Sequence, residues 1–139
     1  MMDIKIDEFC PQSEGYSYLI SPYSHPDPAV RESRYICACL ACVSIYFRFG
    51  EVVYSPIVHW HMIAKEFRLD PTFSLWRRNS IEMLKHASTV RVLTLPGWQE
   101  SVGVRDEIAE ADQQGIPVRY HSLGQLILGE VEKEEEEEE

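Results

Sequence analysis

Ser101, Gly103 and Glu107, in the segment SVGVRDEIAEADQQ (residues 101–114), have the types and spacing most suited to chemistry. A serine hydroxyl and the N–H groups around a glycine suit a phosphate at a helix start, because that helix end is positively polarised. A carboxylate close behind can take part in chemistry on the bound group. Each residue also has a structural interpretation. Ser101 suits a helix N-cap, while Asp106 and Glu107 in the first turn would favourably meet the helix dipole.

Two other segments, each expected directly after a strand, carry polar and aromatic side chains able to hydrogen-bond a ligand. The histidines alternate, and no third metal ligand is implied near them, so we expect no metal site. The candidate ligand-binding residues are Ser21, Tyr23, Ser24 and His25 after the first strand, Ser55, His59 and His61 after the second, and Trp98 beside Ser101 and Gly103 after the third.

Three of the four cysteines crowd into CACLAC (residues 37–42), and the fourth is Cys10. Zinc sites combine such a pair with a second pair at suitable spacing, and none follows here. Cys39 and Cys42 lie inside an apolar helical pattern. We therefore predict buried core thiols, which stay unpaired in a reducing cytosol.

Strand-like and helix-like segments alternate along the whole chain. This order predicts an α/β domain with a mainly parallel sheet of four or five strands, covered by helices on both faces. Such sheets bind ligands beyond the carboxyl ends of their strands, which directs attention to residues 21–26, 55–61 and 96–103. The predicted strands are 16–21, one within 51–58 that Pro56 stops, 89–95 and 116–121. The predicted helices are 28–49, 59–67, 72–87 and 105–114, and 123–131 is a short helix or strand.

The helix at 28–49 has clear local signals at both ends. Asp27 suits the N-cap, Pro28 suits the first helical position, and Gly50 suits the end of the helix. Apolar residues inside it recur at helical spacing, and we predict that they form the stripe facing the core. The stripe consists of Ile36, Leu40, Val43 and Phe47.

Composition predicts one globular domain, residues 1–129, followed by a disordered acidic tail at 130–139. The formal charge is −10, but the tail's eight glutamates and one lysine account for −7 of it. A block of like charge repels itself, so a solvated tail is the simplest interpretation, with a partner-docking segment as the alternative. The remainder has no basic face, so we expect no nucleic acid polymer as partner. The chain has no apolar run that could span a bilayer, and MMDIKIDEFC is unlike a secretory signal; we therefore expect a cytoplasmic protein without a membrane partner.

Three segments together resemble a known family. YLISPYSHPDPAVRESRY, VVYSPIVHWHMIA and LPGWQESVGVRDEIAEADQQGIPV are similar to a small bacterial and phage domain family of the nucleoside 2-deoxyribosyltransferase-like superfamily. That superfamily includes the 2'-deoxynucleoside 5'-phosphate N-hydrolases. The resemblance covers roughly residues 16–118, and its most specific element is Ser-x-Gly-x-x-x-Glu, matched by Ser101, Gly103 and Glu107.

The resemblance implies a flavodoxin-like (Rossmann-like) three-layer fold, a homodimer or higher homo-oligomer, and no cofactor. It implies an N-glycosidase or deoxyribosyltransferase that cleaves the base–sugar bond of a nucleoside or nucleoside monophosphate. Glu107 would attack the anomeric carbon and form a covalent glycosyl-enzyme, while Ser101 and Gly103 would hold the 5'-phosphate. Tyr18, Tyr23 and Ser24 would line the sugar and base pocket.

One position departs from the family pattern. In the element WRRNSIEML (residues 76–84), Ser80 stands where the family has an aspartate that contacts the sugar and helps proton transfer. Either another carboxylate, such as Asp106, takes this role, or activity is weak or lost. A non-catalytic nucleotide-binding or sequestering protein is therefore the alternative function, and an interaction protein using the acidic tail is a third.

Overall fold

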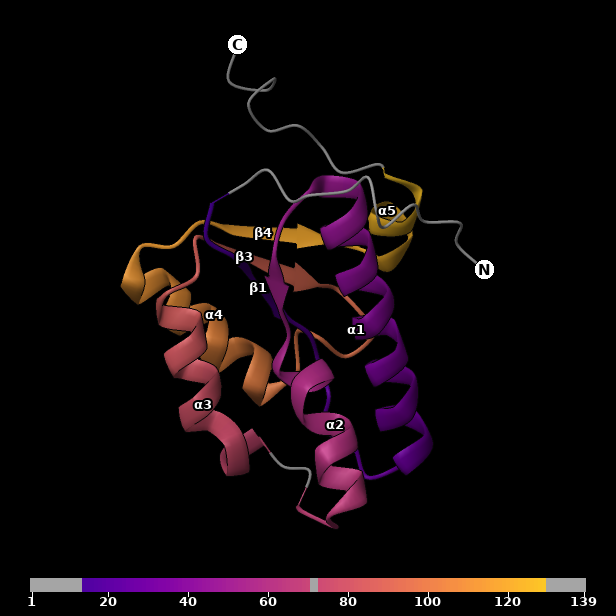
Figure 1. The fold of residues 1–139 in the computed structure, drawn as a ribbon. Coiled ribbons are helices and arrows are strands. Elements are labelled where there is room, and N and C mark those ends of the chain that lie inside the picture. The colour runs from indigo at the N-terminus through magenta and orange to yellow at the C-terminus, as the bar shows by residue number, and fades with distance from the viewer. Residues whose placement is uncertain (1–13, 71–72, 130–139) are drawn as a thin grey trace.

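The computed structural model describes residues 14–70 and 73–129, and the acidic tail expected at 130–139 lies outside them. The described strands form one sheet in the order β2-β1-β3-β4, and every neighbouring pair is parallel (Figure 1). The fold is the predicted α/β, flavodoxin-like or Rossmann-like three-layer domain. The strands are β1 (Ser17–Ile20), β2 (Val53–Tyr54), β3 (Thr89–Leu93) and β4 (Val118–His121).

Helices cover both faces of the sheet. α1 and α5 pack together on one face and α3 and α4 on the other, while α2 packs against α1 (Figure 1). The last predicted segment, left open between helix and strand, is a helix. The helices are α1 (Pro28–Phe49), α2 (Pro56–Glu66), α3 (Phe73–Lys85), α4 (Val102–Gln114) and α5 (Leu123–Leu128).

β1, one of the two inner strands, is buried on both faces, and its side chains alternate between two apolar cores. Leu19 packs with residues of α1, α2 and α5, whereas Tyr18 and Ile20 pack with residues of α3 and α4. Because side chains of a strand alternate between faces, this register places the Tyr18 phenol on the α3/α4 side.

The predicted bounds of α1 are confirmed, but the predicted core stripe is wrong. Asp27 caps the helix by accepting a hydrogen bond from the Ala29 amide, and Gly50 ends it in the left-handed conformation. Two of its members are exposed, Ile36 at 50% and Leu40 at 37%, and the other two, Val43 and Phe47, are half-buried. Small side chains allow the helix to lie close to the sheet, and they contribute little to an apolar periodicity. The buried residues of α1 are Ala38, Ala41, Ser44 and Ile45.

Two other predictions need correction. Cys37, Cys39 and Cys42 are half-buried rather than fully buried, and Cys10 lies outside the described residues. Burial raises the pKa of the Cys42 thiol to about 12, so this cysteine is an unreactive thiol. The second strand ends at Tyr54, before Pro56 as predicted, but the helix predicted at 59–67 already begins at Pro56, because Ser55 caps α2 through the Val58 amide.

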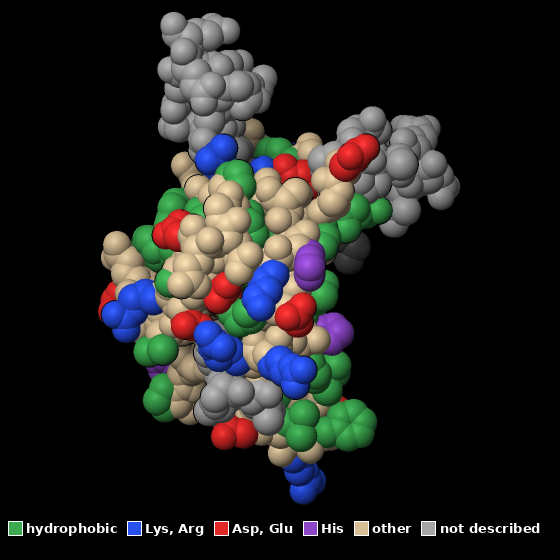
Figure 2. Space-filling model, turned by 90° about the vertical axis from the view of Figure 1, so that its left-hand side faces the viewer, with side chains coloured by type: hydrophobic (Ala, Val, Ile, Leu, Met, Phe, Trp, Pro, Cys, Tyr) green, Lys and Arg blue, Asp and Glu red, His purple; other side chains and the backbone are tan. Residues whose placement is uncertain are grey.

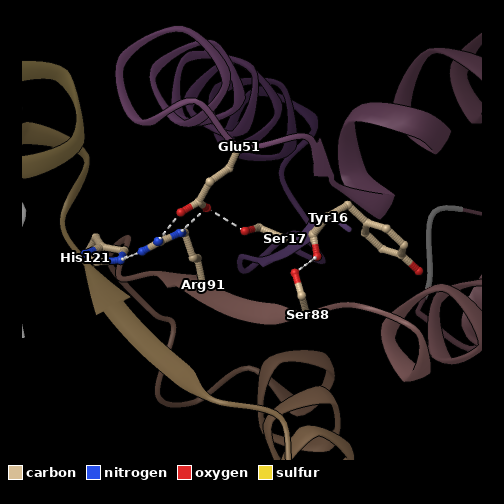
Figure 3. A network of polar contacts seen from close by, with 6 residues as sticks. All are labelled: Tyr16, Ser17, Glu51, Ser88, Arg91 and His121. Carbon is tan, nitrogen blue, oxygen red and sulfur yellow. Dashed lines mark hydrogen bonds and ion pairs between the residues drawn. The ribbon is translucent and has the colours of Figure 1, made fainter. Parts of the chain in front are cut away.

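A network of polar side chains links neighbouring strands on the side of the sheet that α1 and α5 cover (Figure 3). Arg91 on β3 donates two hydrogen bonds to the Glu51 carboxylate, at 2.8 and 2.6 Å, and Ser17 on β1 donates a third at 2.5 Å. The Arg91 guanidinium also contacts His121 Nε2 on β4 at 2.7 Å. Burial, followed by the charge of Arg91, lowers the pKa of His121 to about 4, so this imidazole is neutral at physiological pH. The network joins β1, β3 and β4.

The surface formed by α3 and α4 carries acidic and basic side chains interspersed with one another (Figure 2). Ion pairs occur there between Arg77 and Asp106 at 2.9 Å and between Lys85 and Glu82 at 3.7 Å. None of the helices in the described ranges combines the length and apolar character needed to cross a membrane.

Candidate functional site

A cavity of about 290 Å³ opens beyond the carboxyl ends of β1, β2 and β3. The chain moves from β1 to one side of the sheet through β2 and then returns to the other side through β3, so this point is the topological switch of the sheet. Open α/β sheets bind their ligands there. The lining residues are Ser21, Tyr23, Ser24, Pro56, Ile57, Trp76, Ser80, Glu100, Ser101, Val102, Gly103 and Glu107.

Glu107 is a buried carboxyl group in the wall of this cavity, with a side chain only 4% exposed. The Tyr18 hydroxyl on β1 donates a short hydrogen bond to Glu107 Oε2. α4 begins at Val102, so Glu107 lies in its second turn, and no acidic residue lies in its first turn. The interpretation of Glu107 and Asp106 as first-turn dipole partners is therefore wrong.

Burial raises the pKa of Glu107 to about 8. The Tyr18 hydrogen bond opposes this rise, the nearby charge of Asp106 adds to it, and the more distant Arg77 opposes it. The pKa of Tyr18 is also raised well above 10, by burial and by the Glu107 charge. Near neutral pH, Glu107 therefore holds a proton that it can release close to physiological conditions. A carboxyl group with this property can serve as an acid, a base or, once ionised, a nucleophile.

Two hydroxyl groups of the cavity wall are buried without a hydrogen-bond partner among the described residues, those of Ser21 and Ser80. Ser21 is 5% exposed and Ser80 is fully buried. The Ser80 hydroxyl lies near enough to Tyr18 to oppose the rise of the Tyr18 pKa, although no hydrogen bond of normal geometry joins them. Native structures rarely leave buried polar atoms unsatisfied, so these hydroxyls are available to a ligand.

The start of α4 forms another part of the wall. Ser101 is its N-cap, and its Oγ accepts a hydrogen bond from the Val104 amide at 3.2 Å. The hydroxyl hydrogen remains free to donate, and the first amide groups of a helix have no partner within the helix. Ser101, Val102 and Gly103 line the cavity, so this wall can accept an anionic group. The N-cap and anion-binding interpretations of Ser101 are compatible.

Arg34 on α1 holds together two of the loops that form the site. Its guanidinium donates to the Ser24 carbonyl at 3.0 Å and to the Pro96 carbonyl at 3.2 Å. Gly97 follows with φ +90, and a Cβ there would come within 2.8 Å of Arg34 Nη2. A side chain at this position would be strained and would displace the arginine.

Several predicted residues lie outside the cavity lining. His25 is exposed and accepts a hydrogen bond from the Asp27 amide, and Ser55 caps α2. His59 is exposed on α2 beside Tyr54, and Trp98 packs against Tyr120. Asp106 pairs with Arg77 and faces a separate surface hollow. The cavity brings together Ser21, Tyr23, Ser24, Ser101, Gly103 and Glu107, with Tyr18 bonded to Glu107.

Trp76 is an aromatic wall residue that the sequence did not indicate as a ligand contact. Its backbone departs from helical geometry within α3, at φ −117 and ψ 17. The indole ring is 6.0 Å from both the Tyr23 and the Trp60 rings and lies parallel to Trp60. Only the tertiary structure brings these rings together, because they come from separate segments.

His61 faces a second cavity of about 280 Å³ behind Tyr23. Its Nε2 lies 3.0 Å from Glu32 on α1, an acidic residue 29 positions away that no local pattern identified. In the described part of the chain, no group of three or more histidine, cysteine, aspartate or glutamate side chains is arranged to hold a metal ion.

A comparison with curated proteins finds no match. A family model described as a domain of unknown function, DUF1937, matches residues 15–123. The matched region begins just before β1 and ends at the start of α5, so it contains the sheet and all cavity residues. It also covers most of the 139 residues. The chain therefore belongs to the DUF1937 family.

Proposed function

We propose that this protein cleaves the bond between base and sugar in a nucleoside or, preferably, a nucleoside 5'-monophosphate. The observation that carries the proposal is the buried Glu107, held by Tyr18 in a cavity at the topological switch point. The same residue completes the Ser-x-Gly-x-x-x-Glu element by which the sequence resembles nucleoside 2-deoxyribosyltransferase-like proteins.

In this proposal, the cavity orients the substrate from its phosphate end. The hydroxyl of Ser101 and the amides near Gly103 bind the 5'-phosphate, which fixes the sugar beside Glu107. The unpaired hydroxyls of Ser21 and Ser80 are available to sugar hydroxyls. The base then lies against the apolar and aromatic wall formed by Ile57 and Trp76.

Glu107 acts as the nucleophile in a two-step reaction. Its carboxylate attacks the anomeric carbon as the base departs, and water or a second base then resolves the glycosyl-enzyme. The carboxylate is the minor form below a pKa of about 8, so kcat/KM is expected to rise as pH approaches that value. A poorly solvated carboxylate is well suited to stabilise the positive charge that develops on the sugar.

The test is a panel of NMPs, dNMPs and their nucleosides, including modified bases, with released base measured by chromatography. The expected result is release from one group of substrates and loss of release in Glu107→Ala. Inclusion of a free acceptor base separates transferase from hydrolase activity. Base release that persists in a folded Glu107→Ala variant would refute the assignment of Glu107 as the nucleophile.

Ser101→Ala tests the phosphate site, with Ser122→Ala as the matched control. Both serines are N-caps that accept a hydrogen bond from a helix amide, in α4 and α5 respectively. Each substitution is expected to lower the unfolding free energy by about 1 kcal/mol. Only Ser101→Ala should lower the affinity for the monophosphate relative to the affinity for the nucleoside, because Ser122 does not line the cavity.

The second candidate function is non-catalytic nucleotide binding or sequestration, which Ser80 favours. This residue is fully buried in the cavity wall, where the resemblance leads us to expect an aspartate that assists proton transfer. Saturable nucleotide binding by calorimetry without base release from any substrate would favour this function over the glycosidase.

We further propose that the protein forms a homodimer or higher homo-oligomer. The outward face of α1 supports this, since Ile36 and Leu40 expose apolar surface there. Sedimentation of the wild type and of an Ile36→Glu variant tests the assembly, and monomers for both would exclude it.

A further inference from the structure

Three side chains form a hydrogen-bonded chain between the main cavity and the second cavity. The Tyr23 hydroxyl lies 2.7 Å from His61 Nδ1, and His61 Nε2 lies 3.0 Å from Glu32 Oε1. Tyr23 lines both cavities, whereas His61 and Glu32 line only the second. The hydrogen-bonded side chains of Tyr23, His61 and Glu32 therefore connect the wall of the main cavity with the second cavity.

Packing holds the two inner members in position. Tyr23 is 8% and His61 is 5% exposed. The Tyr35 ring stacks on His61 at 4.1 Å with an interplanar angle of 18°, and the Tyr23 ring meets His61 edge-on. Because both ring nitrogens of His61 are engaged, its orientation is determined on both sides.

Glu32, at the outer end of this hydrogen-bonded series, is in contact with solvent. The Glu32 side chain is 41% exposed and also contacts Lys65 Nζ at 3.5 Å. Protons can therefore enter or leave through the second cavity without passing the substrate. The charged and titratable groups around His61 are Tyr23, Glu32 and Tyr35, with Arg31, Lys65 and Arg68 also lining this cavity.

Among the described residues that line the main cavity, no other side chain is a suitable proton donor for a departing base. The titratable lining residues are Tyr23, Glu100 and Glu107, and Glu100 is exposed to solvent. Glu107 is the nucleophile in the proposed function, Ser80 has no acidic proton, and Asp106 is paired with Arg77 outside the lining. Burial raises the pKa of Tyr23, so the phenol keeps its proton near neutral pH.

We propose that Tyr23 is the catalytic acid that protonates the departing base and that His61 and Glu32 resupply its proton. This inference rests on the proposed base–sugar cleavage. With His61 as the imidazolium, stabilised by Glu32, its Nδ1–H donates to Tyr23 and leaves the Tyr23 proton free for the base.

The relay balances over the two steps. As the bond between sugar and base breaks and the Glu107–sugar bond forms, the Tyr23 proton moves to the base and the His61 Nδ1 proton moves to Tyr23. Neutral His61 remains. When water attacks the sugar and releases Glu107, the proton of the water returns through Tyr23 to His61, so that the same groups act first as acid and then as base.

The test compares two leaving groups in the full-length protein. One substrate is the natural monophosphate found in the panel, and the other is the corresponding 4-nitrophenyl glycoside 5-phosphate, whose leaving group departs as a stable anion without a proton. Tyr23→Phe is expected to lower base release by roughly 100- to 10,000-fold while nitrophenolate release stays within about threefold. His61→Gln should show the same selectivity.

Tyr120→Phe serves as the matched control, since Tyr120 is 49% exposed and lies outside the cavity lining. Equal losses with both substrates in Tyr23→Phe, or no loss with either, would overturn the relay while leaving the glycosidase proposal intact. If the wild type releases neither base nor nitrophenolate, the proposed function itself fails, and the relay fails with it.

Discussion

Glu51 and Glu107 are two poorly exposed glutamates on opposite sides of the same sheet, and their surroundings differ. Glu51 receives two hydrogen bonds from Arg91 and one from Ser17 on the α1/α5 side. Glu107 on the α3/α4 side receives one from the uncharged Tyr18 and borders a cavity. Burial acts to raise the pKa of Glu51, but these bonds and the Arg91 charge outweigh it and lower the pKa. For Glu107, burial prevails and the pKa rises to about 8.

The difference separates a structural carboxylate from a reactive one. A carboxylate paired with a bidentate arginine is fixed in geometry and charge, which suits a group that joins strands. A buried carboxyl group without a contacting cation has a raised pKa, because burial disfavours its charged form. Carboxyl groups of this kind cluster at functional sites. The hydroxyl groups of Ser21 and Ser80, which line the same cavity as Glu107, are also buried without a partner among the described residues. Such groups are likewise typical of a site that binds a ligand.

The largest expected contrast is catalytic. Glu107→Gln should lower base release on the order of 10⁴-fold or more, because the amide cannot attack the sugar. Glu51→Gln, assayed where the variant remains folded, should retain release close to wild type. Comparable losses in both variants at equal folded fraction would erase the distinction between the two glutamates.

The second contrast is the pH dependence of stability. The unfolded state releases the Glu107 proton near pH 4.5, whereas the folded state retains it to about pH 8. The Glu107 contribution to stability is therefore fully present below pH 4.5 and is lost as pH rises to about 8. Between these values, urea unfolding should show a fall of roughly 2–5 kcal/mol that Glu107→Gln lacks. Parallel pH profiles for the two proteins would indicate that Glu107 ionises normally.

The third contrast is the contribution of Glu51 to stability, which depends on pH in the direction opposite to that of Glu107 and which Glu51→Gln removes. Removal of one partner leaves the half-buried Arg91 charge unpaired, for an expected destabilisation of about 2–4 kcal/mol at neutral pH. Because the Glu51 pKa is lowered, its contribution is present above pH 4.5 and is lost as pH falls through the folded-state value. The destabilisation measured in chemical unfolding should therefore shrink in acid, and a constant difference would contradict the ion pair's role.

Ser80→Ala gives the smallest expected effect on stability. The Ser80 hydroxyl is buried without a partner in the described part of the chain, so its removal should change the unfolding free energy by less than about 1 kcal/mol. Nucleotide affinity, measured by calorimetry, should fall by about fivefold if the hydroxyl bonds the ligand. A large loss of stability would show that the hydroxyl already has a structural partner.

Local signals predicted much of the fold. Asp27, Pro28 and Gly50 correctly defined α1, because capping and backbone preferences act within a few residues. The alternation of strands and helices predicted the parallel sheet. The apolar periodicity of α1 predicts a core-facing stripe, yet Ile36 and Leu40 are exposed, because periodicity identifies an apolar face without indicating what covers it.

Part of the candidate site was also predictable. Residues after the first and third strands do converge on one cavity, since parallel strands end at the same edge of a sheet. The positions of His59, Trp98 and Asp106 were not predictable, because the direction of a side chain depends on the helix bounds and the neighbouring elements.

The sequence by itself determined the α/β class, the caps and the chemical types available after each strand, because these follow from periodicity and short-range preferences. Only the tertiary structure decided that Tyr18 meets Glu107 across 89 positions of the chain and that Glu51 meets Arg91 across 40. Partner choice at such separations depends on strand order and sheet face, and it decides the charge state of each glutamate. The same reason explains why Glu32, far from His61 in sequence, could be found only in the folded protein.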